Sequence, residues 1–87
     1  MKTNTENRTL IFDESSLKAF AKQLKKIRKE IGITQTQLAF ESGLSLSQIA
    51  RIETAKINPT LSTIFAIIKA LDIPPCKMFD FELPSKE

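Results

Sequence analysis

Two helix starts follow each other in the stretch Thr34-Gln-Thr-Gln-Leu-Ala-Phe-Glu-Ser-Gly-Leu-Ser-Leu-Ser-Gln-Ile-Ala-Arg-Ile-Glu53. Thr34 is followed three residues later by Gln37, and Ser45 is followed three residues later by Gln48. Each pair has the spacing of a capping box, in which a hydroxyl and an amide side chain satisfy free backbone N–H groups at the start of a helix. The stretch therefore predicts two short helices in quick succession.

Gly43 lies between the two starts, where the first helix must end in a residue that tolerates positive φ. We expect helices over roughly residues 35–42 and 46–54, joined by a tight turn. This is the layout of a helix-turn-helix, which presents its second helix to the DNA major groove. The plainer alternative is an ordinary αα-hairpin within another helical domain. The contacts that fix the helix crossing are expected from Leu38, Ala39, Ile49 and Ile52.

A long helix is predicted before this unit. Asp13 or Ser15 can cap its start, and Gly32 follows its expected end near Ile31. Its apolar side chains recur with the i, i+3, i+4, i+7 spacing of a core-facing helix. They are Leu17, Phe20, Ala21, Leu24, Ile27 and Ile31.

Two more helices are predicted after it. Thr60 can cap a helix that ends before the run Asp72-Ile-Pro-Pro75, and Pro75 suits the first turn of a short helix reaching Met78 or Phe79. The fold class is thus all-α with five helices. The apolar face of the fourth helix is wide and comprises Leu61, Ile64, Phe65, Ile67, Ile68 and Leu71.

The two chain ends leave alternatives open. Phe79, Phe81 and Leu83 alternate with acidic residues, a period of two that is typical of a strand. Such a strand would pair with Leu10–Phe12 or with a second subunit; otherwise the segment is a tail laid over the core. We divide the chain into an N-terminal extension (1–14), a helical domain (15–79) and a C-terminal tail (80–87).

Composition and charge indicate which classes of function are compatible with this chain. Residues 15–78 carry ten Lys or Arg against four Asp or Glu, so the basic charge lies in the helical body, as phosphate binding requires. The 87 residues include no histidine and one cysteine, Cys76, which argues against an enzyme, a metal site or a bound cofactor. No apolar run is long enough to span a membrane, and the N-terminus lacks the apolar stretch of a signal peptide, so we expect a cytoplasmic protein.

The chain resembles the phage repressor and Cro-like helix-turn-helix family, also called the xenobiotic-response-element family. The resemblance covers about residues 17–79 and implies a five-helix fold, binding to operator DNA, a homodimer on a palindrome and no catalysis. The residues that carry it are Leu24-Lys-Lys-Ile-Arg-Lys-Glu-Ile-Gly32, Thr34-Gln35, Leu38-Ala39, Ser42-Gly43, Ile49-Ala-Arg-Ile-Glu53, Asn58-Pro59-Thr60-Leu61 and Ala70-Leu-Asp-Ile73.

By position, the resemblance assigns DNA contacts. Gln35 would contact a phosphate with its side chain or its backbone N–H from the start of the second helix, and Lys56, Asn58 and Thr60 would make further contacts with the DNA backbone. The groove-facing side of the third helix would read bases: Arg51 suits guanine O6 and N7, Gln48 could read adenine unless its capping box occupies it, and Leu46 could meet a thymine methyl group. The full base-reading set is Leu46, Ser47, Gln48 and Arg51.

The resemblance also assigns structural roles. Arg28 and Glu53 would form a partly buried ion pair between the first and third helices. Ala55 departs from the family pattern, which has glycine there; it must either adopt left-handed geometry or shift the loop.

Two function classes follow. The first is a double-stranded-DNA-binding transcriptional regulator, a repressor in our interpretation, that acts as a homodimer. The alternative is an antitoxin that binds a toxin protein as well as its own operator. The dimer interface is expected at the end of the chain, where four large apolar residues fall within six positions: Met78, Phe79, Phe81 and Leu83.

Overall fold

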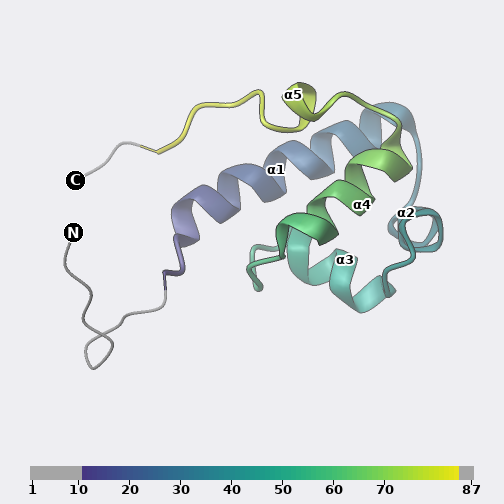
Figure 1. The fold of residues 1–87 in the computed structure, drawn as a ribbon, viewed down its shortest axis with the longest axis horizontal. Helices are drawn as coiled ribbons and strands as arrows, with labels where there is room; N and C mark the ends of the chain where they lie inside the picture. The colour runs from purple at the N-terminus through teal and green to yellow at the C-terminus, as the bar shows by residue number, and fades with distance from the viewer. Residues whose placement is uncertain (1–10, 85–87) are drawn as a thin grey trace.

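The computed structural model describes residues 11–84, and these residues form five helices and no strand (Figure 1). The all-α prediction with five helices is therefore confirmed for this part of the chain. The helices are α1 (Glu14–Ile31), α2 (Gln35–Ser42), α3 (Leu46–Glu53), α4 (Leu61–Leu71) and α5 (Pro75–Met78).

Local chemistry sets the ends of these helices. Of the two candidate caps for α1, Asp13 serves: its carboxylate accepts the Ser16 backbone N–H at 3.2 Å. Hydrogen bonds from the Ser16 hydroxyl and backbone lower the pKa of this carboxyl group. Gly32 ends α1 with φ of 91°, a left-handed conformation that costs glycine little. Asp72 ends α4 in the same region, with φ of 55°.

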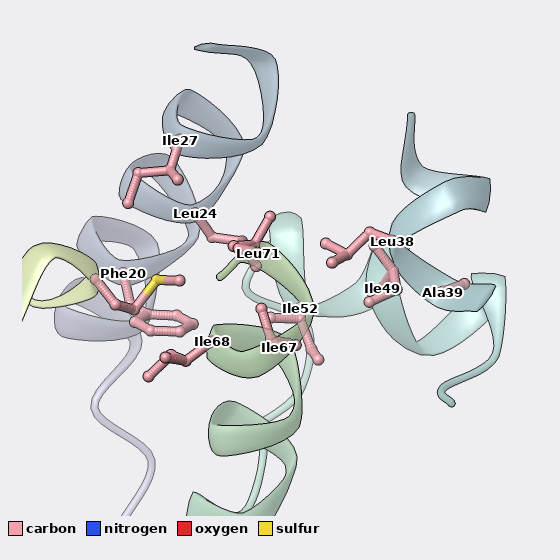
Figure 2. Packing of buried hydrophobic residues seen from close by; sticks show 11 residues of the cluster. Phe20, Leu24, Ile27, Leu38, Ala39, Ile49, Ile52, Ile67, Ile68 and Leu71 are labelled. Carbon is pink, nitrogen blue, oxygen red and sulfur yellow. The ribbon is translucent and has the colours of Figure 1, made fainter. Parts of the chain in front are cut away.

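The core draws side chains from all five helices. Figure 2 shows Phe20 and Leu24 of α1 near Ile68 and Leu71 of α4, while Leu38 of α2 lies near Ile49 of α3. Close packing of such side chains is the main stabilising contribution in a chain of this size. The cluster comprises Phe20, Leu24, Ile27, Leu38, Ala39, Ile49, Ile52, Ile67, Ile68, Leu71 and Met78.

The last described residues run back along α1 (Figure 1). The Gln23 side-chain amide of α1 donates a 2.8 Å hydrogen bond to the Lys77 carbonyl of α5. Beyond α5, the Phe79 ring packs at a centroid distance of 5.7 Å on Phe20 and of 6.5 Å on Phe81. The last described residues therefore cover the first half of α1.

This arrangement decides between the two alternatives left open for these residues, in favour of a tail laid over the core and against a strand. Residues 79–84 form a turn and an irregular segment, in which the Phe81 N–H donates to the Phe79 carbonyl at 2.9 Å. A bond between residues two apart curls the chain instead of extending it, because a strand needs its N–H groups for a neighbour. Ile11 and Phe12 are not in a strand either, and Leu10 lies outside the described residues.

Some apolar residues expected in the core lie on the surface. Ile31 is 46% exposed at the end of α1, and on α4 Leu61 and Phe65 are 59% and 44% exposed. The apolar face of α4 is thus wider than the face that its neighbours cover. Met78 differs from its expectation in the opposite direction: it was expected at a dimer interface, but it is fully buried.

Candidate nucleic-acid interface

Two complete capping boxes build the α2–turn–α3 unit. The Thr34 hydroxyl accepts the Gln37 N–H at 3.0 Å, while the Gln37 side-chain oxygen accepts the Thr34 N–H at 2.8 Å. Ser45 and Gln48 repeat this pattern at the start of α3, with both distances at 3.0 Å. Both helix starts predicted from the sequence are confirmed.

The turn between the helices is tight because Gly43 adopts φ of 77°. The Leu44 N–H then returns to the Ala39 carbonyl at 3.1 Å, which closes the end of α2. Leu38 and Ile49 face each other across the turn and are both fully buried. The crossing angle of α2 and α3 is therefore held by backbone geometry at one end and by packing along the helices.

One face of α3 is exposed and the opposite face is buried. Ile49, Ile52 and Glu53 are buried, whereas the four residues predicted to read bases are exposed. Leu46 is 48% exposed, so about half of its surface is free of its own domain. The exposed set consists of Leu46, Ser47, Gln48 and Arg51.

Arg28 fixes the far end of α3 to α1. Its Nε donates to Glu53 Oε2 at 2.6 Å, its Nη2 donates to Glu53 Oε1 at 3.0 Å, and its Nη1 donates to the Ile33 carbonyl at 2.9 Å. The hydrogen bond to the Glu53 carboxylate raises the pKa of the Arg28 guanidinium, although burial opposes this effect. The Glu53 side chain is inaccessible to solvent, so this pair is more deeply buried than the sequence suggested.

Gln35 has a partner that the sequence analysis missed. Its side-chain nitrogen donates to Glu53 Oε1 at 2.9 Å, which ties the first residue of α2 to the last residue of α3. The side chain expected to reach a phosphate is thus held against the domain by one of its two amide hydrogens. No local pattern signals this bond, because the two residues are 18 positions apart and meet only in the folded chain.

In the loop after α3, Ala55 adopts left-handed geometry, which is the first of the two alternatives expected for this residue. Ala55 has φ of 58° and is buried, and its N–H donates to the Ile52 carbonyl at 3.2 Å. The Lys56 N–H donates to the Arg51 carbonyl at 2.9 Å, which completes a Schellman motif. An alanine therefore occupies a position where glycine is less strained.

This loop carries the residues that were assigned to contacts with the DNA backbone. Lys56 and Asn58 are exposed. Thr60 is exposed too, but its hydroxyl caps α4 by accepting the Thr63 N–H at 3.2 Å. The hydroxyl of Thr60 is therefore already engaged, whereas the ammonium group of Lys56 has no ion pair within residues 11–84.

The interface prediction needs one correction. Met78 belongs to the subunit's own core and offers no surface to a partner. Leu83 is 69% exposed, Phe79 is 45% exposed, and Phe81 is partly buried against the core. Sequence alone cannot tell which of four neighbouring apolar residues points inward.

Two other features bear on the kind of site. In the part of the chain that the structure describes, no cluster of three His, Cys, Asp or Glu side chains could hold a metal ion. None of the helices within residues 11–84 is long and apolar enough to cross a membrane.

A capped helix pair whose second helix has a buried apolar face and an exposed polar face defines a helix-turn-helix domain. The chain belongs to the helix-turn-helix family of DNA-binding transcriptional regulators, whose sequence model matches residues 24–78. This is a DNA-binding class and not a catalytic one. The resemblance stated from the sequence is confirmed.

The relatives include repressors. The immunity repressor of Bacillus phage phi105 is 49% identical over 51 residues, which cover 59% of this chain and 35% of the repressor. A helix-turn-helix transcriptional regulator of Haemophilus influenzae is 39% identical over 70 residues, which cover 75% of this chain and 71% of that protein. The chain thus spans about a third of the phage repressor's length but most of the second relative's length.

Solved structures share the fold over most of the chain. The restriction-modification controller protein C.AhdI from Aeromonas hydrophila superposes with a TM-score of 0.71 at 36% identity, covering 72% of this chain and 96% of that chain. A mutant of the controller protein C.Esp1396I bound to its highest-affinity operator site superposes with a TM-score of 0.72 at 32% identity. That match covers 78% of this chain and 90% of the controller chain.

Proposed function

We propose that this protein is a sequence-specific DNA-binding repressor that places α3 in the major groove of a palindromic operator and binds it as a homodimer. The observation that carries this proposal is the exposed face of α3. Its four groove-facing side chains have the types that read base edges, and the opposite face is fixed to the core. The operator-bound structure of a similar controller protein supports the same use of the fold.

The arrangement of charge and caps supports phosphate binding around this face. Arg51 and Lys56 are exposed cations at the end of α3 and in the loop that follows it. The first turn of α2 contains backbone N–H groups without partners in the helix, and helix N-termini attract anions. We assign Gln35, Lys56, Asn58 and Thr60 to contacts with the DNA backbone, which position the domain without selecting sequence.

The pairing of two subunits follows from the size of the site. A single α3 of eight residues reads only a few base pairs, whereas two copies about 34 Å apart read two half-sites one helical turn apart. The apolar surface that we assign to this pairing runs from the last residue of the helical domain into the tail, and it consists of the exposed Phe79 and Leu83 and the partly buried Phe81. Residues 15–79 would then bind DNA, and residues 80–87 together with Phe79 would contribute to the dimer.

The test is selection of bound sequences from a random double-stranded DNA pool, followed by titration of the selected site at rising salt. We expect an inverted repeat and an affinity that falls on the order of a hundredfold or more between 50 and 200 mM salt, because several phosphates are contacted per dimer. Enrichment of no sequence, or an affinity that does not respond to salt, would refute the proposal. A toxin-like protein that co-purifies with the chain and blocks operator binding would instead favour the antitoxin alternative.

A further inference from the structure

An apolar groove of about 330 Å³ lies beside the end of the chain, at the start of α1. One wall comes from the first turns of α1, a second from α4 and the loop before it, and a third from residues 79–83. We call this hollow the tail groove. Its main apolar lining consists of Leu17, Phe20, Pro59, Ile64, Phe79 and Phe81. Its volume is well above that of a single leucine side chain, so the groove has room to receive one.

The polar side chains of the tail groove do not require a polar occupant. The Ser16 hydroxyl donates to Asp13 Oδ2 at 2.7 Å, and the Ser16 backbone N–H donates to Asp13 Oδ1 at 3.2 Å. Asp13 and Asn58 are themselves exposed, so their polar groups stay in contact with water. An apolar side chain can therefore enter the groove without leaving a buried polar group unpaired.

Leu83 lies at the rim of this groove and is 69% exposed, so it does not fill the groove of its own subunit. In a two-fold pair, both subunits use the same surface patch. A protruding residue and the hollow that receives it must then lie side by side on one surface. The tail groove and Leu83 meet this condition, and an unrelated partner would not require it.

We propose that the tail groove receives Leu83 of a second copy of this chain, and that the contact occurs twice around the two-fold axis of the homodimer. This inference rests on the proposed function, because it identifies the surface on which the two subunits would close. It extends the interface from the tail to segments that are distant in sequence, namely the start of α1 and Pro59. Pro59 follows Asn58, which we assign to the DNA backbone, so the partner's tail would lie beside a loop that approaches DNA.

The main experiment is a cross-link between two chains that carry one cysteine each. Both contain Cys76→Ser, which removes the exposed natural thiol. One chain carries Leu83→Cys, and the other carries Ser16→Cys and a size tag, so that the mixed pair is recognised after oxidation. Neither chain can form a disulfide within itself. We expect a disulfide between the two chains, because Ser16 lines the groove that Leu83 would enter.

The control chain carries Lys29→Cys in place of Ser16→Cys. Lys29 is exposed on the same helix, about 20 Å along its axis from Ser16, and should not cross-link to position 83. Cross-linking of Ser16→Cys no greater than that of Lys29→Cys, in a chain that sediments as a dimer, would overturn the inference while the homodimer stands. A wild-type chain that is monomeric both free and on its selected operator would instead refute the homodimer itself, and the inference with it.

Filling the groove from within gives an independent measurement. Ser16→Leu places a large side chain in the groove and should weaken association at least about tenfold, because the space for Leu83 of the partner subunit is lost. The cap of α1 should survive, since the Ser16 backbone N–H remains. Ser15→Leu is the matched control: Ser15 also donates its hydroxyl to Asp13, but it is exposed and outside the groove lining.

Sedimentation of the two variants at micromolar concentration decides the outcome. We expect Ser16→Leu to dissociate at concentrations where Ser15→Leu and the wild type remain dimeric, with melting temperatures of the two variants within a few degrees of each other. Equal association of the two variants would overturn the inference. That result would also be obtained if the occupant of the groove were residues 1–10 of the same chain or an unrelated protein.

Discussion

Arg28 and Glu53 form two parallel hydrogen bonds, from Nε to Oε2 at 2.6 Å and from Nη2 to Oε1 at 3.0 Å, with the carboxylate wholly shielded from solvent. This is the strong bidentate geometry of a guanidinium and a carboxylate. The pair joins α1 to the last residue of α3, and Gln35 adds the start of α2. The position of α3 thus depends on one buried carboxylate.

Removing one member of this pair should therefore destabilise the fold strongly. Arg28→Ala leaves the Glu53 charge buried without its main partner, which costs about 3–5 kcal/mol. Because about 1 kcal/mol shifts the melting temperature of a domain this small by roughly 4–8 °C, the loss is readily seen by thermal circular dichroism. The double variant Arg28→Met with Glu53→Leu should recover much of the lost stability.

The control is Lys18→Ala, which breaks the exposed Glu14–Lys18 pair and should change stability by less than about 0.5 kcal/mol. Equal melting temperatures for Arg28→Ala and Lys18→Ala would contradict this account.

Substitutions of Arg51 and Lys56 should distinguish recognition of the operator sequence from sequence-independent binding to DNA. Arg51→Ala should cost about 1–3 kcal/mol on the preferred site and relax the preference at one base position per half-site, because it removes the contact to a base edge that we propose for Arg51. Lys56→Ala should weaken specific and random DNA by the same factor and reduce the salt dependence. Both affinities are measured by titration on the selected operator and on a scrambled duplex. If Arg51→Ala weakens both duplexes equally, Arg51 contacts phosphate and not a base.

The C-terminal tail should control subunit pairing. Leu83→Ser changes an exposed residue, so it should weaken association with little change in the melting temperature of the domain. Phe79→Ser should do both, because the same ring also covers Phe20. Deleting residues 79–87 should leave a helical, weakly associating chain with much reduced operator affinity. Sedimentation at micromolar concentration is the measurement. A monomeric full-length chain, or an undiminished dimer after Leu83→Ser and after truncation, would remove the tail from the interface.

Replacing Asp72 should increase the stability of the fold. It ends α4 in a left-handed conformation with φ of 55°, and it places a negative charge at the negative end of the helix dipole. Asp72→Gly relieves both effects and should stabilise the fold by about 0.5–1.5 kcal/mol. Asp72→Asn removes only the charge and should give the smaller part of this gain. A melting temperature lowered by Asp72→Gly would show that the aspartate makes a favourable contact that outweighs its strain.

Features fixed by neighbouring residues were predictable from the sequence. The caps at Thr34, Ser45 and Thr60 depend on side chains within three positions, and the turn at Gly43 depends on one residue's freedom at positive φ. The exposed face of α3 follows from its periodicity in the same way.

Features that depend on what covers a surface were not predictable. Leu61 and Phe65 are as apolar as Ile67 and Ile68, and only the placement of the neighbouring helices decides which pair is buried. The burial of Met78 and the curled segment after it depend likewise on contacts with α1, which is distant in sequence. The bond from Gln35 to Glu53 required the ends of α2 and α3 to meet.

The tail that lies along α1 gives this single helix two separate environments. Around Arg28, the helix is held by α3 through buried hydrogen bonds, whereas around Phe20 it is covered by α5 and by residues 79–81. Local opening of a protein follows such differences in contact, and each cooperative unit exchanges its amide hydrogens at its own rate. Lifting the tail would therefore expose the first turns of α1 to solvent exchange while its last turns stay protected. The amide hydrogens of α1 should therefore exchange at two rates, one set by the contacts of α5 and residues 79–81 and the other by the buried contacts with α3.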